Sequence, residues 1–396
     1  METKKKKIGF ILNPYAGIGG KAGLKGSDNY KKIEKLLLEG CERTASKRAE
    51  SCMSKIADLT ASLVAGDKGS VGEKNFSILS APGDMGEALL KKLKIPCDVV
   101  LCPKADTSSA EDTKLCAQIM KEQGVDLLVF CGGDGTARDI CEAVGTDVTV
   151  LGIPAGVKMY SACYACNPYQ AGEMLAGWLE GKEMSYEMRE VLDIEEKDLD
   201  SRNVSPQLYG FLEVLSDGKH LQKAKELDLG SGESATIIAR AAILRMEKDW
   251  VYIIGPGGTT WKIKELLCEN DEQEDTGKKN VHGTVRGVDV IRNGKIILRD
   301  ANERELWDCV NSYSHIKILV TCIGGNGFLL GRGNQQISPR VIRKVGKEQI
   351  EIVEKLAGLG GQPMHVDTGD ADADEYLKGY YKIIFKNSDS AIYKVG

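Results

Sequence analysis

The chain has 396 residues, of which 42% are hydrophobic and 28% are charged, and its formal net charge is −5. This length predicts two domains, and the composition is typical of a soluble globular protein rather than a fibrous or disordered one. The acidic balance argues against nucleic acid or an anionic membrane surface as a partner, and no apolar run has the length of a transmembrane helix.

Alternating strands and helices are expected from the first residues to about residue 160. Strands are expected at residues 7–12, 76–79, 97–101, 125–131 and 148–153. Helices are expected at residues 30–38, 85–93, 110–122 and 136–143, with a helical insertion within residues 42–73. Because short β-branched runs alternate with amphipathic helices, this pattern predicts an α/β domain with a doubly wound parallel sheet over residues 1–160.

The remainder of the chain is richer in strand-like runs. These lie at residues 187–194, 208–215, 235–245, 250–254, 288–292, 295–298 and 316–323, with helices expected at 170–180 and 261–267. Asn293-Gly294 predicts a hairpin turn, because both positions of a type I′ turn need positive φ. Ser338-Pro339 predicts the start of a helix that runs to about residue 356. We therefore expect a β-rich second domain over residues 161–364, followed by a tail that ends in a hairpin.

The start of the chain and its cysteines indicate a cytoplasmic location. The basic residues 4–7 precede an apolar run over residues 8–12 only, which is too short for a signal-peptide core. Most of the twelve cysteines lie inside apolar runs, where a reduced cysteine is a small hydrophobic residue. The CxxC pair of Cys163 and Cys166 has no second pair at zinc spacing, and the four histidines are scattered. The pattern therefore predicts neither a disulfide framework nor a metal site.

The strongest chemical signal is Gly132-Gly133-Asp134-Gly135-Thr136, between a predicted strand and a predicted helix. The strand delivers this loop to the carboxyl edge of the sheet, where open α/β folds bind ligands. Glycines let backbone N–H groups approach a phosphate, and the helix N-terminus favours an anion. An acid in such a position is useful if it receives a proton or holds Mg²⁺, so Asp134 is the candidate catalytic residue. The alternative interpretation is that Asp134 is a plain helix N-cap.

Two other nucleotide-binding patterns are absent from the sequence. It contains no GxxxxGK[ST] segment, which excludes a P-loop NTPase. It also has no GxGxxG directly after a strand with an acid about twenty residues further on, which argues against a Rossmann dehydrogenase.

Several segments together resemble the ATP-NAD kinase superfamily, which includes NAD kinases, diacylglycerol kinases and sphingosine kinases. Residues 132–136 look like the shared signature, and residues 13–21 resemble the loop after the first strand in the lipid kinases. Residues 152–158 lie where these families carry a second nucleotide-phosphate loop. Residues 19–28 and 331–339 resemble a group of predicted ATP-NAD kinases that includes acetoin-operon proteins. With these segments the resemblance covers nearly the whole chain.

The resemblance implies roles for individual residues. Asp134 matches the acid that receives the proton of the acceptor hydroxyl. The residues implied to hold nucleotide in the first domain are Asn13, Gly17, Gly19, Gly20, Gly132, Gly133, Gly135, Thr136, Gly156 and Lys158. After the strand at 250–254, the segment Gly257, Gly258, Thr259 and Thr260 resembles the Thr-Gly-Ser-Thr nucleotide loop of NAD kinases. Taken alone, this segment also fits an ordinary turn before a helix.

As a whole, the resemblance implies a kinase that uses ATP (or polyphosphate) and Mg²⁺ to phosphorylate a hydroxyl. The 2′-hydroxyl of NAD, giving NADP, is the preferred acceptor, in a cleft between the domains. The resemblance also implies that the tail, about residues 365–396, packs back on the first domain. We expect small-molecule nucleotides as partners, no nucleic acid or membrane partner, and a homo-oligomeric assembly. Two alternatives stay open, namely a kinase of another small hydroxyl compound or lipid and a non-catalytic nucleotide sensor.

Three further clusters of polar residues have alternative interpretations. NAD kinases carry an Asn-Glu pair before their Thr-Gly-Ser-Thr loop, whereas Asn302-Glu303 follows the matching segment here, so we interpret Asn302 as a helix cap. Residues 324–334 contain Arg332, which fits either a phosphate contact or a structural crossover. Acids at residues 367–374 lack the spacing of a calcium loop and favour a helix start instead.

Overall fold

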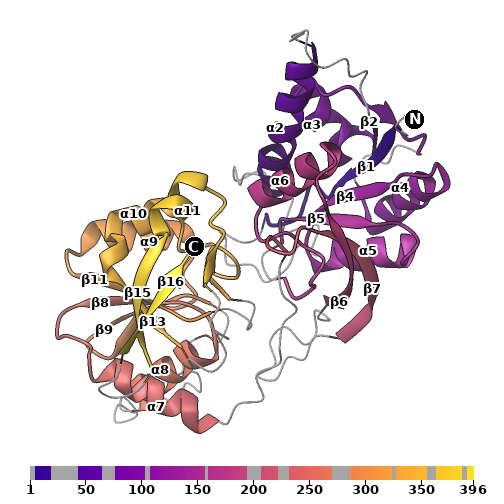
Figure 1. Ribbon diagram of the computed structural model, residues 1–396. Helices are drawn as coiled ribbons and strands as arrows, with labels where there is room; N and C mark the ends of the chain where they lie inside the picture. The colour runs from indigo at the N-terminus through magenta and orange to yellow at the C-terminus, as the bar shows by residue number, and fades with distance from the viewer. Residues whose placement is uncertain are drawn as a thin grey trace. The chain divides into compact units, whose positions relative to one another are not determined.

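The computed structural model describes residues 5–18, 43–64, 76–102, 108–156, 159–193, 207–221, 232–269, 284, 287–322, 327–354, 363–385 and 390–396. These residues belong to two compact units. The first unit comprises Met1–Ile18 and Gly26–Ala224, and the second comprises Gly19–Lys25 and Lys225–Gly396. Each unit has its own sheet with helices on both faces (Figure 1).

The sheet of the first unit has the strand order β3-β2-β1-β4-β5-β7-β6. Its strands are β1 (Lys6–Leu12), β2 (Phe76–Ser80), β3 (Asp98–Val99), β4 (Leu127–Gly132), β5 (Val150–Pro154), β6 (Ser185–Asp193) and β7 (Gln207–Ser216). Strands β1 to β5 are parallel, whereas β6 and β7 form a long antiparallel pair at one edge. Its helices are α2 (Thr44–Val64), η1 (Gly83–Met85), α3 (Glu87–Lys92), α4 (Ala110–Glu122), α5 (Asp134–Val144) and α6 (Pro168–Leu179).

Strand β4 shows why the centre of this sheet is apolar throughout. All six of its residues are buried, because helices cover both of its faces. Val129 packs in the cluster formed with α2, α3 and α6, and its neighbour Phe130 packs in the cluster formed with α4 and α5. This alternation follows the two-residue period of a strand. The apolar run that precedes the glycine loop is therefore a fully buried central strand.

The order of the strands creates a point at which ligands bind in this class of fold. Chain connections from β1 and β2 run through α2 and α3 on one face, whereas those from β3 and β4 run through α4 and α5 on the other. Strands β1 and β4 are neighbours, so the loops that follow them leave the sheet toward opposite faces. A crevice at the carboxyl ends of two such strands is the usual ligand site of an open α/β sheet.

The sheet of the second unit has the order β10-β9-β8-β11-β13-β15-β16. Its strands are β8 (Val251–Ile254), β9 (Asp289–Arg292), β10 (Lys295–Leu298), β11 (Ile316–Val320), β13 (Ile350–Val353), β15 (Gly379–Ile384) and β16 (Ser390–Val395), beside the separate pair β12 (Phe328–Leu330) and β14 (His365–Val366). The strands β8, β11, β13 and β15 run parallel, and the outer strands are antiparallel. The sheet is therefore mixed.

Helices cover both faces of the second sheet as well. They are α7 (Gly232–Ile243), α8 (Gly258–Glu269), α9 (Glu303–Ser312), α10 (Pro339–Val345), η3 (Lys347–Gln349) and α11 (Ala371–Leu377). Helices α7 and α8 pack on one face and α9, α10 and α11 on the other, as Figure 1 shows. The predicted fold class is confirmed, with a parallel-dominated sheet in the first unit and a mixed, strand-rich sheet in the second.

The units differ in extent from the domains expected from the sequence. The first unit continues past residue 160 to Ala224, because α6 packs on α2 and the β6–β7 pair joins the first sheet. The C-terminal strands β15 and β16 pair within the second sheet. The implied contact of this tail with the first domain stays a prediction.

Two predicted elements of the second unit are wrong. Residues 235–243 lie in helix α7 rather than in a strand, because Ile238, Ala239 and Ala242 recur at helical spacing and pack on the sheet. Helix α10 ends at Val345 instead of near residue 356, since Gly346 has a φ of 90° and stops the helix. Residues 350–353 are then free to form β13, whose β-branched residues suit a central strand.

Other local predictions are confirmed. Asn293 and Gly294 have φ values of 51° and 78° and connect β9 to β10 as expected for the hairpin turn. Asn302 is the N-cap of α9 and forms a capping box with Glu305. The helix predicted at residues 30–38 lies outside the described residues. Within the described ranges, no helix is long and apolar enough to cross a bilayer.

Candidate nucleotide-binding site

Three loops meet at the carboxyl edge of the first sheet. They follow β1, β4 and β5 and are joined by backbone hydrogen bonds. The amide of Asn13 donates to the carbonyl of Cys131 at 2.9 Å. The amides of Ala155 and Gly156 donate to the carbonyl of Gly132 at 2.8 and 3.2 Å. The predicted residues Asn13, Gly132 and Gly156 therefore lie in one connected structure.

Close packing explains why glycine is required at several of these positions. Gly17 has a φ of 77°, and a Cβ there would overlap the carbonyl oxygen of Ala155. A Cβ on Gly133 would lie 3.0 Å from the Cα of Gly156. Gly135 differs, because its Cβ position faces open space with only Nη2 of Arg138 at 4.0 Å. The Gly135 side of the loop is thus the part that another molecule can approach closely.

Asn13 and Thr136 connect the first loop to helix α5. The side-chain amide of Asn13 donates to Oγ1 of Thr136 at 3.0 Å, while its Oδ1 accepts from the amide of Tyr15 at 3.0 Å. Thr136 is buried in the first turn of α5. These bonds fix the β1 loop against the helix start, so both predicted residues have positioning contacts.

Asp134 is the first residue of α5 and is 5% exposed. Its Oδ2 accepts from the amide of Tyr160 at 2.6 Å, and its Oδ1 accepts from the amide of Ser161 at 3.0 Å. Burial raises the pKa of Asp134 to about 7, although hydrogen bonds from Ser161 and Tyr160 lower it and the charge of Asp193 raises it further. Because Gly133 is the N-cap of α5, Asp134 is not the plain cap that the alternative interpretation requires.

Tyr164 contacts the glycine loop through a hydrogen bond, and the sequence did not predict this role. Its hydroxyl donates to the carbonyl of Gly133 at 2.5 Å. Its fully buried ring packs edge-on against Phe130 at 5.4 Å and fills the space beside Gly152. The only sequence signal was an aromatic residue in an apolar run, which predicts a core position rather than a loop support.

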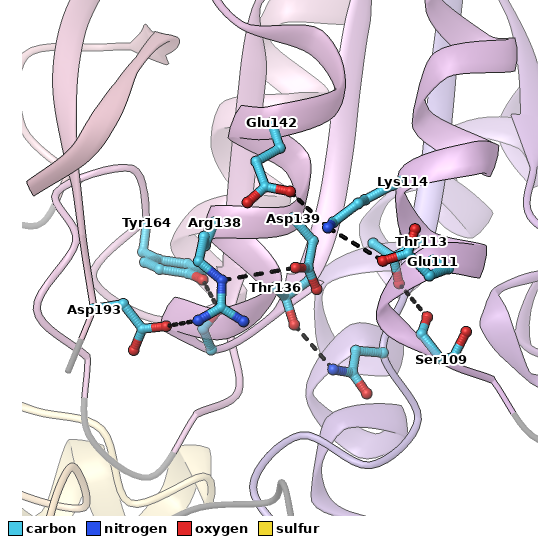
Figure 2. Close-up of polar contacts among 12 residues, drawn as sticks. Ser109, Glu111, Thr113, Lys114, Thr136, Arg138, Asp139, Glu142, Tyr164 and Asp193 are labelled. Atoms are coloured by element: carbon cyan, nitrogen blue, oxygen red, sulfur yellow. Dashed lines mark hydrogen bonds and ion pairs between the residues drawn. The ribbon is translucent and has the colours of Figure 1, made fainter. Parts of the chain in front are cut away.

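Arg138 lies one helical turn after Asp134, among acidic side chains (Figure 2). Its Nη1 donates to Asp193 at 2.8 Å, its Nε is 3.9 Å from Asp139, and its Cζ lies over the ring of Tyr209, 5.6 Å from the ring centroid. Asp139 is also buried, and burial raises the pKa of this carboxyl to about 6 despite the positive charges of Arg138 and Lys114. An i, i+4 spacing from Asp134 on a predicted helix could have indicated Arg138.

The second predicted loop lies in the second unit, between β8 and α8. Gly257 has a φ of 135°, and a Cβ there would overlap Cγ2 of Thr321. Thr260 is fully buried, and its hydroxyl donates to the carbonyl of Gly257 at 3.1 Å. Thr259 is 7% exposed, and Gly258 has open space around its Cβ position. Like the first loop, this segment stands at the carboxyl end of a central strand, where β8 neighbours β11.

The remaining candidates have local partners or lie beyond the described residues. Arg332 forms a buried ion pair with Asp367 at 2.9 Å, which favours the structural crossover for this segment. Asp370 is the N-cap of α11, as a helix start predicts. Gly19, Gly20 and Lys158 lie outside the described residues. Among the residues that are described, no group of three or more His, Cys, Asp or Glu side chains could hold a metal ion.

A doubly wound sheet whose glycine loops surround a buried acid defines a nucleotide-phosphate-binding protein of the α/β class. Residues 8–183 match the model of the ATP-NAD kinase N-terminal domain, and residues 248–395 match that of the ATP-NAD kinase C-terminal domain. The chain therefore belongs to the ATP-NAD kinase family. This membership implies a phosphotransferase with an alcohol group as acceptor and ATP as a substrate.

Comparisons with curated proteins and with solved structures give no further information about the function of the chain. No curated protein matches the chain. Among solved structures, it is similar to a protein assigned as a diacylglycerol kinase from Bacillus anthracis, with 14% identity and a TM-score of 0.23. That similarity covers 46% of this chain and 44% of the other, so the chain spans under half of the structure it matches. A likeness of this extent says nothing about the activity of this chain.

Proposed function

We propose that the chain is an ATP-dependent kinase that phosphorylates the 2′-hydroxyl of the adenosine ribose of NAD and so forms NADP. The observation that carries the proposal is Asp134, a buried acid with a pKa of about 7 at the meeting point of three loops. A general base works best when its pKa lies near the operating pH, because it is then both available and basic enough to accept a proton. An ordinary surface aspartate would be a much weaker base at neutral pH.

The proposed step is an in-line displacement at phosphorus. The oxygen of the acceptor hydroxyl forms a bond to the γ-phosphorus of ATP, and the bond from that phosphorus to the β–γ bridging oxygen breaks. ADP leaves with the electron pair of the broken bond, and the proton of the hydroxyl moves to the carboxylate of Asp134. Catalysis then depends mainly on positioning and on stabilising negative charge.

The first loop supplies the contacts that ATP requires. Amides in the first turn of α5 and the dipole of that helix attract an anion, and the open side of Gly135 lets a phosphate approach. Mg²⁺ would arrive bound to the phosphates of ATP, because the described residues do not assemble a metal site and both oxygens of Asp134 accept amides. Polyphosphate fits the same anion contacts and remains the alternative donor.

The second loop supports NAD as the acceptor. NAD has a pyrophosphate and two riboses to hold, so it needs more polar contacts than a small polyol does. Gly258 and Thr259 begin a twelve-residue helix at the end of β8, where amides and a hydroxyl can hold a nucleotide. Thr260 is less available, because its hydroxyl already donates to Gly257.

The test is NADP formation from ATP and NAD by the purified chain, followed by the same assay on two variants. Thr259→Val should raise the KM for NAD about fivefold with little change for ATP, because a lost hydroxyl contact costs ~1 kcal/mol. Thr260→Val is the matched control, since its hydroxyl is used inside the second unit. It should lower stability without a selective effect on NAD.

The outcomes separate the alternatives. Phosphorylation of a different acceptor without NADP formation would contradict NAD as the substrate and support a kinase of another small hydroxyl compound or a lipid. No phosphorylation of any acceptor, together with tight nucleotide binding, would contradict the enzyme and support the sensor. An equal effect of both threonine variants on NAD would contradict the role given to Thr259.

A further inference from the structure

Arg138 is a positive side chain that extends toward the glycine loop. It extends from the second turn of α5, and its Nη2 lies 4.0 Å from the Cβ position of Gly135. Apart from this nitrogen, that side of Gly135 is open. A phosphate that approaches the loop there therefore comes within reach of a guanidinium.

The direction of the guanidinium is fixed by three groups other than the loop. Nη1 donates to Asp193, Nε lies 3.9 Å from Asp139, and Cζ lies over the ring of Tyr209, 5.6 Å from its centroid. Asp193 and Tyr209 come from the ends of β6 and β7, which pair with each other along the edge of the sheet. A long, mobile side chain is thus held in one orientation before any ligand binds, which lowers the entropic cost of a contact.

We propose that Arg138 contacts the terminal phosphoryl group of the bound nucleotide and stabilises its negative charge during transfer. The inference rests on the proposed kinase activity and adds a residue to it. Guanidinium groups suit this task because they stay charged and donate several hydrogen bonds in a fixed plane. ADP lacks the group that Arg138 would contact, so the residue should help the site to distinguish ATP from ADP.

The competing interpretation is that Arg138 only ties β6 to α5. Lys114 offers a matched comparison, because it also forms an ion pair with α5, to Glu142 at 2.6 Å. Figure 2 shows Lys114 between Glu111 and Glu142, on the other side of Asp139 from Arg138 and Asp193. Lys114, which extends from α4, therefore tests the loss of a cation that pairs with α5 without the loss of a group beside Gly135.

The experiment measures the dissociation constants of ATP and ADP by calorimetry for the wild type, Arg138→Met, Arg138→Lys and Lys114→Met. We expect Arg138→Met to lower the preference for ATP over ADP by about tenfold or more, as for a lost charged hydrogen bond. Arg138→Lys should retain part of the preference, and Lys114→Met all of it. This measurement needs no acceptor, so it separates the role of Arg138 from the choice of NAD as substrate.

Kinetics with whichever acceptor is phosphorylated complete the test. Arg138→Met should lower kcat by about 10²-fold or more with a smaller change in KM, because the contact strengthens as charge develops. An unchanged ATP preference in a folded Arg138→Met protein would overturn the proposal. Equal losses of preference in Arg138→Met and Lys114→Met would also overturn it, since the effect would then come from α5 as a whole.

Discussion

The two glycine loops occupy equivalent places in their sheets but differ in chemistry. Each follows a central parallel strand and begins a helix. The first loop contains the buried acid Asp134 and is followed one turn later by Arg138. The second contains hydroxyls, and the buried Lys264, one turn after Thr260 in α8, is paired with Asp289 at 3.0 Å. Topology therefore explains where both loops lie, whereas the acid marks the first loop as the candidate centre of proton transfer.

The largest expected effect is on turnover, and it distinguishes Asp134 in the first loop from the threonine hydroxyls in the second loop. Asp134→Asn should lower turnover by ~10²–10⁴-fold, because the variant cannot accept the proton of the acceptor. Thr260→Val, an equally small change in the second loop, should leave turnover within a few-fold of the wild type. The measurement is kcat at saturating substrates, with thermal unfolding to confirm that both variants are folded. Wild-type turnover by Asp134→Asn would contradict the mechanism.

The next prediction concerns the buried cation of the second unit. The ammonium of Lys264 donates to the carbonyls of Thr284 and Gly287 as well as facing Asp289. Lys264→Met should destabilise the second unit by ~3–5 kcal/mol, because Asp289 keeps a buried charge without its partner. ATP affinity of the folded variant should not change. The measurement is denaturant unfolding together with an ATP titration.

Lys262 on the same helix provides the control for that experiment. Its ion pair with Glu265 is partly exposed, so Lys262→Met should lower the free energy of unfolding by less than about 1 kcal/mol. If the two lysine variants lowered the free energy of unfolding by similar amounts, burial would not be what makes the ion pair of Lys264 important for stability.

A third prediction compares the glycines. Gly133→Val should weaken ATP binding at least about tenfold, because Cγ atoms added beside Gly156 would push the two loops apart. Gly258→Ala should be tolerated, since nothing lies within 4 Å of its Cβ position and alanine favours a helix. Calorimetric titration with ATP checks both variants. Unchanged affinity in a folded Gly133→Val protein would argue against this loop as the phosphate site.

The last prediction concerns the pH dependence of turnover and of stability. Because the base acts when ionised, kcat should rise about tenfold per pH unit below the pKa of Asp134, about 7, and level off above it. Burial raises this pKa in the folded protein, so Asp134 contributes stability that is present at acid pH and lost as the pH rises through about 7. Burial also raises the pKa of Asp139, to about 6, so this residue likewise contributes stability that is lost as the pH rises through about 6.

Comparison with Asp134→Asn isolates the contribution of Asp134 to the pH dependence of the folding stability. Between pH 4 and pH 8, the wild type should lose stability relative to this variant, as measured by thermal unfolding at each pH. A constant difference in stability across that range would contradict the raised pKa.

The sequence predicted the parts of the fold that depend on short patterns. Asn293-Gly294, Asn302 and the fully apolar β4 were found because turn, cap and buried-strand signals are local. The wrong prediction for α7 has a different cause. A run of alanine and isoleucine fits either a strand or a helix, and only packing against the sheet selects one of them.

In the candidate site, too, short sequence patterns predicted local features but not contacts between distant segments. The glycine loop could be recognised because its residues are adjacent in sequence. The support from Tyr164 and the pair of Arg138 with Asp193 join segments that are 31 and 55 residues apart. Such contacts depend on how β5, α5 and the β6–β7 pair meet, which no single motif encodes.

The backbone amides that bind Asp134 have a practical consequence for spectroscopy. Tyr160 and Ser161 donate directly to the carboxylate, so the electron density around their amide protons changes when Asp134 gains or loses a proton. In a nitrogen–proton correlation spectrum, these two resonances would move with the charge of the acid. The protein therefore contains its own pair of nuclear-magnetic-resonance indicators for the ionisation of a residue that is otherwise almost inaccessible to probes.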